Sequence, residues 1–88
     1  MTHRATASFW SAFERLPEAV QRRARKNHRL PDADARHPSL HFKRLAGTVP
    51  PLWSARVGRD YRALALERDG PAFWFWIGPH VEYDRLVS

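Results

Sequence analysis

The sequence predicts an α+β fold, with two helices packed on a sheet of three or four antiparallel strands. Three observations support this prediction. Apolar residues in the first third of the chain recur at helical spacings, apolar and polar residues alternate from residue 52 onward, and tight-turn signals separate the later segments. Helices followed by a run of strands are typical of α+β proteins rather than of alternating α/β folds.

The composition is compatible with one small domain over residues 1–88. The 88 residues are 12% aromatic and include four Trp and five Phe, which is enough apolar bulk for one core. The chain contains no Cys, so a disulfide scaffold and a Cys-bearing zinc site are both excluded.

The charge is strongly basic and suggests a polyanionic partner. Fifteen Lys and Arg residues stand against nine acidic residues, and only Lys26 and Lys43 are lysines. The planar guanidinium of Arg suits phosphate oxygens and stacks on bases, which favours nucleic acid. The alternative is a basic surface that meets water or an acidic protein.

The first residues lack the apolar core of a signal peptide, and no apolar run could span a bilayer, so we expect a cytoplasmic protein.

The first helix is predicted over residues 8–16. Phe9, Phe13 and Leu16 are spaced three and four apart and therefore share one helical face. Ser8 is a candidate for its N-cap.

The second helix is predicted from Pro17 to Leu30, because Pro suits a first helical turn. Its apolar stripe is narrow and consists mainly of Val20 and Ala24. Basic residues cover most of the remaining surface, where solvated charge is the simplest interpretation and contact with RNA or an acidic partner is the alternative. These basic residues are Arg22, Arg23, Arg25, Lys26 and Arg29.

Four strands are predicted after a turn-rich connection at residues 31–38. The first is Ser39–Leu45, and Leu52–Gly58 follows it with clear alternation. Tyr61–Glu67 and the almost continuous apolar run Ala72–Ile77 complete the set, the last being typical of a central strand.

Turn signals and the two ends of the chain complete the predicted topology. Residues 58–60 form one tight turn and Asp69-Gly70 a second hairpin turn. Gly78-Pro79 is expected to end the last strand. Residues 80–87 could form a short helix or a strand extension, and residues 3–7 could add a short edge strand.

Two arginines are expected to lie side by side on one face of the sheet. The hairpin that joins their strands brings Arg56 close to Arg62. Like charges repel, so a fold that gathers them is expected to bind an anion that offsets the repulsion. The alternative is that Arg62 pairs with an acidic neighbour such as Asp60 or Glu82.

Two further residues could transfer protons. His80 exchanges protons near neutral pH, and Tyr83 lies three residues later, on the same face if the segment is helical. Taken singly, each is more often a surface or capping residue. Pro38 separates His37 from His41 and no carboxylate cluster accompanies them, so no metal site is predicted.

Residues 53–64 resemble the strand pair of RelE/ParE-type toxins. Residues 76–86 resemble the C-terminal tail of the RelE-like branch of that family. Residues 13–20 and 39–45 are similar to the helical hairpin and following strand of that family. The most specific part is Arg-x-Gly-x-x-Tyr-Arg at residues 56–62 together with the later His-x-x-Tyr. The resemblance implies an α+β fold with an N-terminal helical hairpin packed on a twisted, mainly antiparallel sheet.

The same resemblance implies a function. RelE-like toxins are ribosome-dependent mRNA endonucleases that a cognate antitoxin protein neutralises, and they use no metal or cofactor. In that family the 2′-hydroxyl of the RNA attacks the adjacent phosphate. By position, Arg62 matches the phosphate-stabilising arginine, Arg56 a basic residue of the preceding strand, His80 a general acid and Tyr83 the C-terminal tyrosine. The expected contacts to the RNA backbone come from Lys43, Arg44 and Arg59.

The sequence departs from the family pattern in two places. The best-known members have a Lys pair in the strand before the arginine, where this chain has only Arg56 and Ser54. No carboxylate base lies near residues 39–45, so the general base stays open between Tyr83 and His80. A ParE-like gyrase inhibitor and an inactive basic interaction module are the alternatives, and the pair of His80 and Tyr83 favours the nuclease.

Overall fold

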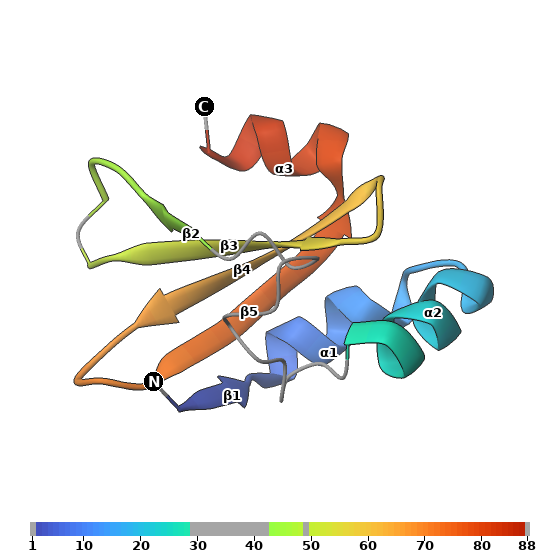
Figure 1. Ribbon diagram of the computed structural model, residues 1–88, viewed down its shortest axis with the longest axis horizontal. Helices are drawn as coiled ribbons and strands as arrows, with labels where there is room; N and C mark the ends of the chain where they lie inside the picture. Colours follow the sequence, from blue (N-terminus) through green and yellow to red (C-terminus); the bar gives the residue numbers. More distant parts are fainter. Residues whose placement is uncertain (1, 29–42, 49, 88) are drawn as a thin grey trace.

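The computed structural model describes residues 2–28, 43–48 and 50–87. Within these residues, a five-stranded sheet has the order β1-β5-β4-β3-β2. Helices α1 and α2 lie on one side of the sheet and α3 lies on the other (Figure 1). The elements in chain order are β1 (His3–Ala5), α1 (Ala7–Glu14), α2 (Glu18–His28), β2 (Lys43–Leu45), β3 (Leu52–Val57), β4 (Tyr61–Glu67), β5 (Ala72–Pro79) and α3 (His80–Val87).

The predicted α+β class and helical hairpin are confirmed, but the count of three or four strands is too low. The additional strand is β1, which lies in the segment 3–7 considered above as a possible edge strand; it pairs in parallel with β5 and brings Ala5 opposite Trp74. The other neighbouring strands are antiparallel. A three-residue strand is too short to show alternation, and its partner lies about seventy residues away, so no hairpin signal marks the pairing.

Helix α1 begins one residue earlier than predicted and has a different cap. The Thr6 side chain, not that of Ser8, accepts a hydrogen bond from the Phe9 backbone N–H at 3.2 Å. Ser8 instead donates to the carbonyl oxygen of Phe75 at 2.9 Å. The second contact ties the start of α1 to β5.

The core lies between α1 and the sheet. Phe9 and Phe13 are at most 1% exposed and pack on a sheet face that contributes Trp74 and Ile77, which are equally buried. Small side chains on the neighbouring strands leave room for these rings, since close packing requires large groups to face small ones. These small residues are Ala55, Ala63 and Ala65.

Helix α2 packs on α1 through few apolar contacts. Ala24 is fully buried, and the Arg25 guanidinium lies over the Phe13 ring at 4.8 Å from its centroid. The Gln21 side-chain amide donates to the Leu16 carbonyl oxygen at 2.9 Å and so satisfies a backbone acceptor after the end of α1. The expected extension of α2 to Leu30 lies outside the described residues.

The predicted β3–β4 hairpin is present and brings the two arginines together. Arg56 and Arg62 are directly opposite one another, and the turn between them contains Gly58 with φ of +66°. Gly accepts this left-handed conformation without the steric cost of a Cβ atom. The second predicted turn contains Asp69 and Gly70, both with positive φ.

Strand β5 does not end at Ile77, before Gly78-Pro79, as predicted. It pairs through both residues, with Arg62 opposite Gly78 and Tyr61 opposite Pro79, and passes directly into α3. The backbone N–H of His80 donates to the Asp60 carbonyl oxygen at 2.8 Å. This junction places the start of α3 beside the β3–β4 turn.

The remaining predicted strand is seen only in part. Strand β2 covers Lys43–Leu45, whereas residues 31–38 and 39–42 lie outside the described residues. None of the helices in the described part of the chain has the length and apolar character needed to cross a bilayer.

Candidate functional site

A polar cavity of about 360 Å³ lies between β2, β3, β4 and α3, on the face of the sheet opposite the helical hairpin. It gathers residues that are distant in the sequence. All four predicted catalytic residues and one of the three predicted RNA contacts line it. The lining residues are Lys43, Ser54, Ala55, Arg56, Arg62, His80, Tyr83 and Asp84.

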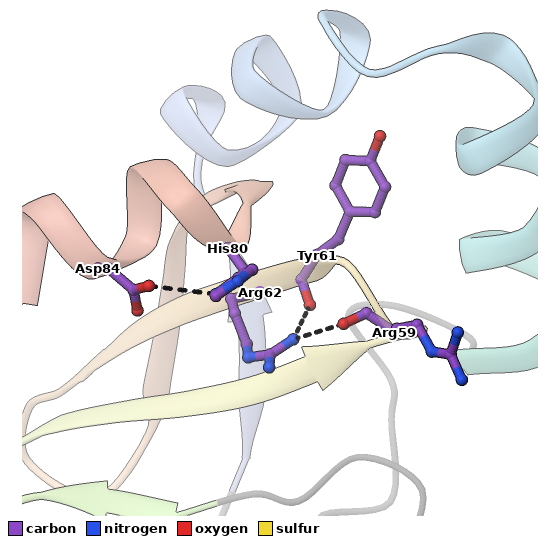
Figure 2. Close-up of polar contacts among 5 residues, drawn as sticks. All are labelled: Arg59, Tyr61, Arg62, His80 and Asp84. Carbon is purple, nitrogen blue, oxygen red and sulfur yellow. Dashed lines mark hydrogen bonds and ion pairs between the residues drawn. The ribbon is translucent and has the colours of Figure 1, made fainter.

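Arg62 is the best anchored cation of the cavity. Its Nη1 donates to the Tyr61 carbonyl oxygen at 2.9 Å and to the Arg59 carbonyl oxygen at 3.4 Å (Figure 2). Neither of the acidic partners considered from the sequence, Asp60 or Glu82, forms an ion pair with Arg62 in the described structure. The two backbone contacts engage one nitrogen of the guanidinium, and its other N–H donors can serve an anion.

Two other cations come from the neighbouring strands. Arg56 is exposed and lies directly across from Arg62, and Lys43 of β2 is paired with Ser54 of β3. The register thus places three positive side chains from three adjacent strands around one cavity. Ser54 is only 3% exposed and lies on the cavity side of β3.

The other two predicted RNA contacts do not line this cavity. Arg44 is opposite Trp53 in the register, so its side chain leaves the sheet on the face away from Lys43 and Ser54. Arg59 lies in the exposed β3–β4 turn, where its carbonyl oxygen accepts a hydrogen bond from Arg62.

His80 and Tyr83 both reach the cavity from α3, and they differ in exposure. The His80 side chain is 49% exposed, and its Nδ1 lies 3.2 Å from Oδ2 of Asp84. Tyr83 is 9% exposed and holds α3 to the sheet while still lining the cavity. A half-exposed imidazole and a packed phenol at one cavity can each exchange a proton with a bound molecule.

Asp84 is the residue of this site that the sequence analysis missed. It is the one carboxylate among the lining residues, against three Lys and Arg side chains, so the cavity is suited to an anion. Its position four residues after His80, in a segment that could be helical, was the available signal.

Among the described residues, no group of three or more His, Asp or Glu side chains is arranged to hold a metal ion. His37 and His41 lie outside these residues.

The comparisons with known proteins identify the fold. No protein-family model matches the sequence, and no curated protein matches it. Among solved structures, the chain is similar to one in the crystal structure of the archaeal RelE–RelB complex from Pyrococcus horikoshii OT3. The TM-score is 0.60 and the identity is 25%, and the match covers 90% of this chain and 96% of that one.

This protein therefore has a RelE-like fold, as its sequence predicts. The similarity extends over nearly the whole of both chains and supports its assignment to the RelE-like toxins of toxin–antitoxin systems.

Proposed function

We propose that this protein is the toxin of a toxin–antitoxin system and acts as a metal-independent endoribonuclease that cleaves mRNA on the ribosome. One observation carries the proposal: a single cavity unites three cations with a histidine and a tyrosine. The RelE-like fold supports the toxin assignment. Because ribosomes translate mRNA in the cytoplasm, the proposed location of the protein is the cytoplasm.

The proposed reaction is an intramolecular transfer at phosphorus. The RNA 2′-oxygen attacks the adjacent phosphate and loses its proton to a general base. As the bond to the 5′-oxygen breaks, a general acid donates a proton to that oxygen. The products are a 2′,3′-cyclic phosphate and a 5′-hydroxyl. Because the nucleophile belongs to the substrate, the reaction requires neither a metal-bound hydroxide nor a covalent enzyme intermediate.

The cavity contains a group for each role in this reaction. Arg62, Arg56 and Lys43 surround the position for a phosphate whose negative charge grows in the transition state. Fixed donors at such a position commonly contribute about 3 kcal/mol each. His80 and Tyr83 form the acid–base pair, in which one takes the 2′ proton and the other supplies the proton to the leaving oxygen. Each transfer typically accelerates a reaction by roughly 10²- to 10⁴-fold.

The proposed partners follow from the same surface. An mRNA strand supplies the phosphates, and the ribosome presents that strand to the toxin. The solved neighbour is a RelE–RelB complex, which supports a cognate antitoxin as the protein partner here. Arg44 points away from the cavity, and Arg59 lies at its margin. Both are proposed as contacts to RNA beyond the cleaved bond.

The test is cleavage of mRNA by the purified protein in programmed ribosome complexes. We expect cuts that leave a cyclic phosphate or 3′-phosphate and a 5′-hydroxyl, and that persist when EDTA is added to the assembled complexes. Sedimentation of the ribosomes after EDTA treatment provides the control. Loss of cutting in EDTA while ribosomes stay assembled would overturn the metal-independent mechanism.

A second measurement separates the nuclease from a ParE-like gyrase inhibitor. On induction in cells, a nuclease stops protein synthesis before DNA replication, whereas a gyrase inhibitor stops replication first. An earlier arrest of replication, with no cleaved mRNA, would therefore contradict the nuclease. Absence of any toxicity would indicate an inactive basic module.

A further inference from the structure

A carboxylate faces the histidine of the cavity across one turn of α3. Figure 2 shows Asp84 and His80 pointing toward each other, and Nδ1 of His80 is 3.2 Å from Oδ2 of Asp84. Both side chains line the cavity that also contains Arg62. The arrangement thus joins an acid–base candidate to an oxygen acceptor at the site itself.

The contact determines which imidazole nitrogen is available for chemistry. A carboxylate accepts hydrogen bonds, so this contact favours the form of the imidazole that carries a proton on Nδ1. The hydrogen bond made by one ring nitrogen sets the role of the other, which makes Nε2 of His80 the proton-exchanging atom. Neutral His80 then has a free electron pair on Nε2, and protonated His80 has an N–H there.

The backbone reinforces this orientation. His80 is the first residue of α3, and its N–H is bonded to the Asp60 carbonyl oxygen at 2.8 Å. Tyr83 lies between His80 and Asp84 in the sequence. Its side chain is buried and holds the helix on the sheet. The turn of helix that carries the pair is therefore tied to the β3–β4 turn at its start, and Tyr83 is packed within it.

We infer that Asp84 is a positioning residue that holds His80 with Nε2 directed to the scissile phosphate. This inference rests on the proposed function, because it assigns a role to Asp84 within that reaction. Asp84 serves His80 in either role, whether Nε2 receives the 2′ proton or donates to the leaving oxygen. An exposed helical ion pair that only stabilised α3 would lower the melting temperature when Asp84 is removed and would leave kcat of the folded protein unchanged.

A double-mutant cycle tests whether the effect of Asp84 depends on His80. Asp84→Ala should lower kcat roughly tenfold with KM unchanged, because misplacing the proton-transfer group weakens only the chemical step. Asp84→Asn keeps an oxygen acceptor and should lose less. In a His80→Ala background, Asp84→Ala should have no further effect. Glu82→Gln removes a carboxylate from the same helix, outside this cavity, and should leave kcat unchanged.

The cycle separates failure of this inference from failure of the proposed function. An equal loss from Asp84→Ala with and without His80 would overturn the positioning role while leaving the nuclease intact. If His80→Ala itself cleaved as fast as the original protein, the catalytic role of His80 would fail instead.

Nitrogen-15 NMR of the imidazole tests the positioning without any substrate. At a pH where His80 is neutral, we expect the proton on Nδ1 in the original protein and in Asp84→Asn. In Asp84→Ala we expect a shift toward the form protonated on Nε2. A neutral His80 protonated on Nε2 in the original protein would overturn the inference, even if cleavage were never observed.

Discussion

Arg62 is the residue on which the proposed chemistry depends most. It belongs to β4, the middle strand of the sheet, and two backbone carbonyl oxygens hold its Nη1. A cation held in this way does not have to reorganise when negative charge develops, whereas an exposed side chain such as Arg56 does.

We therefore predict that Arg62→Ala lowers the rate of mRNA cleavage roughly a hundredfold, which corresponds to about 3 kcal/mol of lost transition-state stabilisation. The matched control is Arg68→Ala, which removes an exposed arginine just after the same strand. Circular dichroism should show both variants folded. Undiminished cutting by folded Arg62→Ala would refute its assignment to the site.

The acid–base pair leads to a second prediction. His80→Ala and Tyr83→Phe should each reduce cleavage by roughly a hundredfold or more, because each removes one proton-transfer group. Tyr83→Phe keeps the buried ring that holds α3 and removes only the hydroxyl, so its melting temperature should stay close to that of the original protein. Single-turnover cleavage of ribosome-bound mRNA gives the rates, and a Tyr83→Phe variant that cuts at the full rate would exclude the hydroxyl from the chemistry.

At the scale of elements, the junction of β5 and α3 determines the geometry of the cavity. Because β5 continues through Pro79 without a loop, His80 is carried to the end of the sheet beside Arg62. Gly78, opposite Arg62, is required here for space: a Cβ atom at this position would lie 2.5 Å from Cζ2 of Trp76. The ring of Trp76 can therefore lie over the backbone of β5 only because residue 78 has no side chain.

Gly78→Ala should destabilise the protein by about 1–3 kcal/mol, since the added methyl group forces the Trp76 ring to move. Thermal and urea unfolding measure this loss. In a Trp76→Ala background the same substitution should cost much less, because the clashing ring is gone. An equal cost in both backgrounds would show that something other than this ring excludes a side chain at residue 78.

At the scale of the whole molecule, the sheet has one face that is closed by the helical hairpin and one that presents the basic cavity. Polyanion binding at that cavity should depend strongly on salt. Three phosphate contacts by Lys43, Arg56 and Arg62 predict a slope of about −2 in a plot of log K against log salt for single-stranded RNA. Filter binding or fluorescence anisotropy measures the slope, and a value near zero would contradict a phosphate site.

A toxin has to be held inactive, and the basic cavity is the surface that an acidic or amphipathic antitoxin segment would cover. We predict that co-expression with the cognate antitoxin yields a tight complex in which Arg56 and Arg62 are protected from an arginine-specific reagent. Arg68, outside the cavity, should stay reactive in the complex and serves as the internal control. Full reactivity of both cavity arginines in the complex would rule out steric masking.

The sequence by itself determined the helical hairpin, the β3–β4 hairpin and the proximity of Arg56 to Arg62. Each of these depends on residues close together in the chain, where periodicity and turn signals set the structure. The sequence also indicated His80 and Tyr83 as a pair, and the resemblance to RelE-like toxins added the fold that the solved neighbour supports.

Only the tertiary structure decided how these pieces form one cavity. Lys43 and Arg44 are neighbours in the sequence. Because of the β2–β3 register, the Lys43 side chain reaches the cavity and the Arg44 side chain does not. The role of Asp84 became visible once residues 80–87 proved to be a helix that continues directly from β5. The position of Lys43 and the role of Asp84 both depend on how strands pair and where the chain turns between residues far apart in the sequence. Local patterns of apolar residues do not encode these features.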